Sequence, residues 1–66
     1  MIVRKDDILE REGNLYRVVC CDEEVFIVAT VEFKDDHMIT NYEQLEAYSN
    51  DPAINTLANL KFNKTN

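Results

Sequence analysis

The segment DILEREGNLYRVVCC, residues 7–21, constrains the fold more than any other, because it sets the only glycine of this 66-residue chain between two strand-like runs. Gly13-Asn14 suits a two-residue hairpin turn, in which glycine takes the positive φ that other residues avoid. The segment therefore predicts strands over 6–12 and 15–21. The predicted register pairs residues of matching character: Glu10 with Arg17, Leu9 with Val18, and Ile8 with Val19.

A third strand is indicated by VFIVATVEF, residues 25–33, where every second residue from Val25 onwards is apolar. The alternate residues begin apolar and end polar, which is typical of a central strand that is half covered on its second face. The charged stretches DEE and KDDH flank this strand, and residues 37–40 form a fourth strand or a strand stub. Together these elements predict an antiparallel meander of three to four strands.

Helical signals begin at residue 40, where TNYE matches a capping box. Tyr42, Leu45 and Tyr48 follow at a spacing of three, so we expect a helix over 41–48. Pro52 stands where a first helical residue tolerates proline, and a second helix over 52–61 follows. Residues 62–66 are expected to fray. The chain is therefore predicted to be one α+β domain, a meander followed by one or two short C-terminal helices.

The stretch DILEREGNLYRVV resembles the opening hairpin of small SH3-like barrels, which show an alternating strand, a glycine turn and a Tyr-x-Val strand, here Tyr16 to Val18. The resemblance covers about a dozen residues and implies that the meander closes into an open barrel. The two predicted helices depart from a plain five-stranded barrel. An open meander packed by helices therefore stays an equal alternative.

Charge and composition argue against several functions. The chain carries 13 acidic and 7 basic residues, a formal net charge of −6, which repels a polyanion such as DNA. No segment approaches the ~20 apolar residues that span a bilayer. We therefore expect a cytoplasmic protein that does not bind a membrane. A single glycine does not make a phosphate-binding loop, and no cofactor is expected.

The adjacent Cys20 and Cys21 raise the question of a metal or redox site. Neighbouring residues of a strand point to opposite faces, so two such cysteines do not easily hold one ion. We expect Cys20, which shares parity with Tyr16 and Val18, to pack in the core and Cys21 to lie on the other face. His37 follows two aspartates in an expected turn, so neither a metal site nor a catalytic residue is predicted.

The remaining features favour an interaction surface. The leading hypothesis is a non-enzymatic interaction or regulatory module, whose acidic and aromatic surface occupies a basic protein partner and, as an inhibitor, imitates a phosphate backbone. The alternative is a small barrel that binds nucleic acid through Arg4, Lys5, Arg11 and Arg17, and self-association as a homodimer stays open. The candidate partner-binding residues are Asp22, Glu23, Glu24, Asp35, Asp36, Tyr42 and Tyr48.

Overall fold

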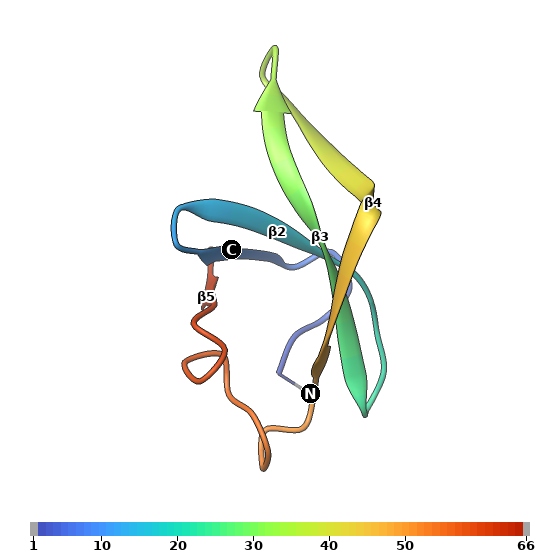
Figure 1. The fold of residues 1–66 in the computed structure, drawn as a ribbon, viewed down its shortest axis with the longest axis vertical. Helices are drawn as coiled ribbons and strands as arrows, with labels where there is room; N and C mark the ends of the chain where they lie inside the picture. The colour runs from blue at the N-terminus through green and yellow to red at the C-terminus, as the bar shows by residue number, and fades with distance from the viewer. Residues whose placement is uncertain (1, 66) are drawn as a thin grey trace.

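The computed structural model describes residues 2–65 as a single antiparallel sheet with strand order β4-β3-β2-β1-β5 (Figure 1). The strands are β1 (Ile8–Arg11), β2 (Asn14–Cys21), β3 (Val25–Lys34), β4 (His37–Ser49) and β5 (Asn63–Lys64). No helix occurs among these residues. The predicted antiparallel meander is therefore confirmed, and the predicted α+β class with C-terminal helices is wrong.

The first hairpin turns at Glu12-Gly13, one residue earlier than predicted. The two turn residues have φ of 54° and 83°, and Arg11 pairs with Asn14 across the turn. In a turn with two positive φ angles, glycine favours the second place, as in Asn-Gly. Gly13 takes that place and Glu12, rather than Asn14, is its companion. The predicted pairing of Leu9 with Val18 is therefore wrong, since Leu9 pairs with Tyr16.

A bulge in β2 reverses the expected roles of the two cysteines. The register with β3 shifts between Val18 and Cys20, so Val19 is an extra residue. Cys21, rather than Cys20, then shares the core face with Val18, and its thiol lies 3.7 Å from the carbonyl oxygen of Val3. Cys20 is exposed. The prediction that Cys20 is buried is wrong for this reason.

The predicted helix over 41–48 lies within the strand β4. Residues 37–41 pair with the end of β3 and residues 45–49 with its beginning, while residues 42–44 are extra in a bulge. These three residues break the alternation of the strand and mimic a helical spacing between Tyr42 and Tyr48. The Tyr48 ring stacks on Phe26, with ring centroids 5.6 Å apart.

Residues 52–61 form separate turns instead of the second predicted helix. Asp51 Oδ1 accepts a hydrogen bond from the Ala53 amide, and Thr56 Oγ1 accepts one from the Asn59 amide. Each capping side chain starts its own turn, and the second cap comes too soon for the first turn to continue as a helix. Residues 62–65 do not fray as expected, because Phe62 is buried and β5 pairs with β1; residue 66 lies outside the described residues.

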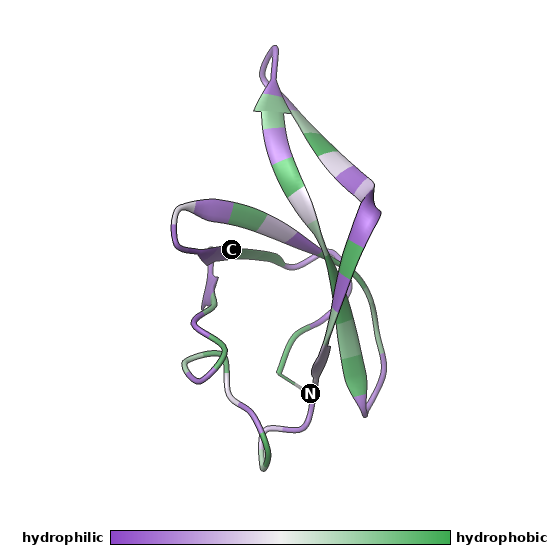
Figure 2. Ribbon diagram, in the orientation of Figure 1, coloured by the Kyte–Doolittle hydropathy of each residue, from purple (hydrophilic) through white to green (hydrophobic). Residues whose placement is uncertain are grey.

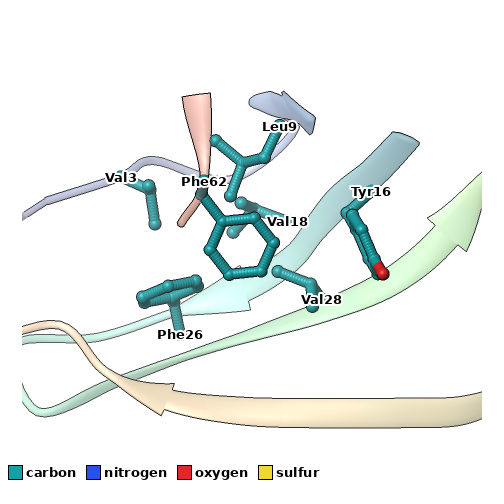
Figure 3. Packing of buried hydrophobic residues seen from close by; sticks show 7 residues of the cluster. All are labelled: Val3, Leu9, Tyr16, Val18, Phe26, Val28 and Phe62. Carbon is teal, nitrogen blue, oxygen red and sulfur yellow. The ribbon is translucent and has the colours of Figure 1, made fainter. Parts of the chain in front are cut away.

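The core fills the concave side of the sheet (Figure 3). The ring of Phe62 lies at its centre, with edge-to-face contacts to Tyr16 at 5.4 Å and Tyr48 at 5.3 Å between ring centroids. Leu57 and Leu60, from the turns before it, pack against the same cluster. The buried hydrophobic members of the cluster are Val3, Leu9, Tyr16, Val18, Phe26, Val28 and Phe62.

A buried asparagine fastens three segments to one another. Asn50 is 0% exposed and follows β4. Its Oδ1 accepts hydrogen bonds from the amides of Ile2 at 2.8 Å and Val3 at 3.3 Å. Its Nδ2 donates to the carbonyl oxygen of Asp22 at 2.7 Å. The side chain therefore holds the N-terminal segment, the β2–β3 turn and the end of β4 together.

Candidate functional site

The β3–β4 hairpin extends beyond the rest of the sheet as an arm, which we define as residues 30–44 (Figure 1). The arm gives the molecule its elongated shape of 39 × 20 × 18 Å. At its tip, Asp35 and Asp36 have φ of 52° and 63°, and Lys34 pairs with His37 across this two-residue turn. Both positive φ angles match the tight turn that keeps two twisted strands together.

The arm exposes large apolar side chains on both of its faces. Phe33 is 60% exposed and lies opposite Met38, which is 42% exposed, on one face. Ile39, 42% exposed, lies on the other face opposite Glu32. Tyr42 in the bulge is 61% exposed. Figure 2 shows hydrophobic and hydrophilic residues interleaved along both strands of the arm.

The arm is also acidic. It carries four carboxylates and one lysine, a net charge of −3 without His37. In the described part of the chain the ion pairs join Arg11 with Glu46, Arg17 with Asp6, and Lys64 with Asp7. None of these pairs involves a carboxylate of the arm. Its acidic residues, which are therefore available to a partner, are Glu32, Asp35, Asp36 and Glu43.

The candidate residues proposed from the sequence do not form one patch. Asp35, Asp36 and Tyr42 lie on the arm, whereas Asp22, Glu23 and Glu24 form the turn at the other end of β3. At 3.2–3.4 Å per residue, the ten residues of β3 separate the two turns by roughly 30 Å.

Asp22 and Tyr48 make contacts that support the fold. The Asp22 carboxylate accepts hydrogen bonds at 2.8 Å from the amides of Val25 and Glu24, and these bonds lower its pKa. Tyr48 is half-buried against Phe26.

Sequence reasoning missed a cluster around Arg11, in which one guanidinium bridges β1 and β4. Arg11 Nη1 donates to the hydroxyl of Tyr48 at 2.9 Å, and its Nη2 lies 3.1 Å from Glu46 Oε2. Its guanidinium carbon lies 4.4 Å from the ring centroid of Phe62. The bonds to Tyr48 and Tyr16 raise the pKa of Arg11 further. These contacts join strands that are far apart in the sheet, which no local pattern reveals.

The contacts of this cluster shift the pKa values of its ionisable groups in opposite directions. The hydroxyl of Tyr48 donates to Glu46, and this bond lowers the pKa of Glu46. Burial, followed by the bond to Glu46, raises the pKa of Tyr48. Arg11 and Glu46 therefore stay charged, and Tyr48 neutral, over the ordinary pH range. The arrangement fixes the curl of the sheet and leaves Arg11 little freedom for a ligand.

The basic residues of the alternative hypothesis are divided between different surroundings. Arg17 Nη2 and Nε donate to Asp6 Oδ1 at 2.8 and 3.1 Å, and these bonds raise the pKa of Arg17. Arg11 is held in the aromatic cluster. Of these four residues, only Arg4 and Lys5 are exposed without an ion pair to another described residue.

Residues 2–65 offer no other candidate for metal binding or enclosed ligand binding. No group of three or more histidine, cysteine, aspartate or glutamate side chains there is arranged to hold a metal ion, and no pocket is enclosed. His37 lies exposed beside the turn of the arm. This part of the chain has no helix of the length and apolar character needed to cross a bilayer. No known protein family, curated protein or solved structure matches the chain.

Proposed function

We propose that this chain is a non-enzymatic interaction module that binds a basic protein partner through the arm. The observation that carries the proposal is the combination, on one projecting hairpin, of exposed apolar side chains and carboxylates without an ion pair in the described chain. Exposed apolar surface of this kind is typical of protein interfaces. The proposal places the protein in the cytoplasm, in keeping with its two free thiols.

The two kinds of side chain contribute differently to binding. Complete burial of a side chain such as Phe33 or Met38 in an interface stabilises the complex by about 1.5–3 kcal/mol. The carboxylates around them accelerate the approach of a basic surface and disfavour an acidic one. A partner that normally binds nucleic acid would offer such a basic surface, and the arm would then act as an inhibitor of it.

The test is capture of the partner by crosslinking in the native cell, with matched variants of the full chain. The double variant Phe33→Ser with Met38→Ser should lose the partner, whereas Ile54→Ser should retain it. Ile54 is a suitable control because it is 67% exposed but lies outside the arm. Retention of the partner by the double variant would refute the proposal.

Charge reversal tests the electrostatic part of the proposal. Asp35→Lys with Asp36→Lys should weaken capture much more than Glu23→Lys with Glu24→Lys, which makes the same change in charge at the other end of β3. If the protein is an inhibitor, DNA should displace it from the captured partner. The affinity of the partner for the protein should also fall as the salt concentration rises. Direct binding of DNA by the isolated protein, lost in Arg4→Glu with Lys5→Glu, would favour the nucleic-acid alternative instead.

A further inference from the structure

The edge of the sheet at β4 is open along an unusual length. β4 has 13 residues and is the last strand in the order of the sheet, whereas the opposite edge is the two-residue β5. Its residues from His37 to Ala47 are exposed, apart from the half-buried Thr40. Natural edge strands are often protected by lysine or proline, and β4 contains neither.

The hydrogen bonds of the sheet show which backbone groups point away from it. In an antiparallel pair, residues alternate between those bonded to the neighbouring strand and those directed away. The amide of Asn50 donates to the carbonyl oxygen of Glu24 at 2.8 Å, so the alternation directs the backbone groups of Ser49, Ala47 and Leu45 outwards. The bulge at residues 42–44 ends this regular segment.

The side chains along this segment alternate in character. Leu45, Ala47 and Ser49 lie on the face of the sheet that also carries Ile27, whereas Glu46 and Tyr48 lie on the core face. In an antiparallel strand added here, every second residue directs its backbone amide and carbonyl towards β4 and lies opposite Leu45, Ala47 or Ser49. The side chains of these residues lie on the same face of the sheet as those of Leu45, Ala47 and Ser49. The other residues of the added strand lie beside Glu46, whose carboxylate is paired with Arg11 but whose side chain stays 49% exposed. Apolar residues fit the first set of positions, and basic residues fit the second.

We propose that the outer edge of β4, from Leu45 to Ser49, receives an extended segment of the partner, alternately apolar and basic, as a sixth strand. This inference rests on the proposed function and names the form in which the partner binds. Charge selects this occupant over a second copy of the chain, because two copies would each bring a net charge of −6 to one interface.

The probe is the acetylated and amidated peptide KVKVKVK, titrated into the full chain labelled with nitrogen-15. The amide resonances of Leu45, Ala47 and Ser49 should shift, and that of Lys64 in β5 should not. N-methylation of the valines removes the amides that face β4 and should weaken binding about tenfold or more, as expected for lost backbone hydrogen bonds. N-methylation of the lysines alters the amides that face away and should change affinity little.

Variants of the protein supply a matched pair. Ala47→Pro removes an outward amide without removing a bond to β3, and should weaken binding by a similar factor. Ala47→Val keeps that amide and should bind as the unaltered chain does. If Ala47→Pro fails to fold, the two methylated peptides decide the question on the unaltered protein.

Several results would overturn strand addition. These are no binding of the peptide, equal binding of the valine-methylated peptide, and a dimer of the chain that Ala47→Pro dissociates, which would make a second copy the occupant. The proposed function is judged separately by the arm. A partner lost with Phe33→Ser and Met38→Ser but retained with Ala47→Pro would support the arm and reject the added strand.

Discussion

Replacement of Asn50 by alanine tests whether this side chain holds the fold together. The change removes three hydrogen bonds to backbone groups, from Ile2 and Val3 and to Asp22. At about 1 kcal/mol for each bond, the loss is about 3 kcal/mol. A chain of this size is expected to have a total stability of roughly 3–10 kcal/mol. Asn50→Ala should therefore remove a large part of the free energy of unfolding.

The assay is urea denaturation followed by circular dichroism. The midpoint should fall while the slope stays the same, because the same surface is exposed on unfolding. Asn59→Ala is the control, since Asn59 is exposed and should change the midpoint little. A loss below about 1 kcal/mol for Asn50→Ala, the contribution of one bond, would refute the reasoning.

Replacement of Asn50 by aspartate should make the stability of the protein depend on pH. Asn50→Asp keeps the acceptors for Ile2 and Val3 but removes the donor to Asp22, and it buries a carboxylate. Burial raises the pKa of such a group in the folded state, so the protonated form is favoured there. The variant should gain stability relative to the unaltered protein as pH falls towards about 4, and lose it as pH rises through the folded pKa. An unchanged difference across this range would contradict the assigned contacts.

Three further predictions follow from the turns and the bulge. A thiol reagent should modify the exposed Cys20 well before the half-buried Cys21 in the folded protein. Glu12→Asn should raise the free energy of unfolding by about 0.5–1 kcal/mol, because asparagine tolerates the left-handed backbone better than glutamate does. The pKa of Asp22 is lower in the folded protein than in the unfolded chain, where it is about 3.9, so stability should fall as pH drops below that value. Asp22→Asn should reduce this acid sensitivity.

Each of these predictions has a matched control. Mass spectrometry of Cys20→Ser and Cys21→Ser assigns the modified thiol, and faster reaction of Cys21 would contradict the bulge. Glu23 is also a turn residue but lacks the positive φ of Glu12, so Glu23→Asn should give no gain in stability. Equal acid sensitivity of Asp22→Asn and the unaltered protein, measured by urea denaturation between pH 2 and pH 5, would show that the turn does not depend on the carboxylate.

The sequence predicted the elements that arise from local alternation and failed where distant contacts decide. β2 and β3 follow from their regular apolar pattern, within a residue at each end. The single extra residue Val19 has no signal of its own, yet it exchanges the faces of the two cysteines. The spacing of Tyr42 and Tyr48 is compatible with a helix, and only the apolar partner strand β3 makes a strand preferable.

The candidate site was predicted in part for the same reason. Asp35, Asp36 and Tyr42 were identified from composition, and the structure places them on one arm. The exposure of Phe33 and Met38 was not foreseen, because alternation indicates which residues share a face but not whether anything covers that face. The structural role of Asn50 was not foreseen either, because its partner Ile2 is 48 residues away in the sequence.

The central position of Phe62 has a consequence for how the molecule folds. The ring that fills the core comes from near the end of the described chain, and β5 beside it pairs with β1, so that Leu9 meets Lys64. Contacts between residues so distant in sequence require closure of a long loop before they contribute stability, and small proteins dominated by such contacts fold on a scale of about milliseconds to seconds. Until residue 62 arrives, Tyr16, Phe26 and Tyr48 lack the aromatic ring that they pack against. The first four strands would therefore form a hairpin assembly with an uncovered apolar interior, and folding would be completed only when Phe62 and β5 dock onto the core and β1.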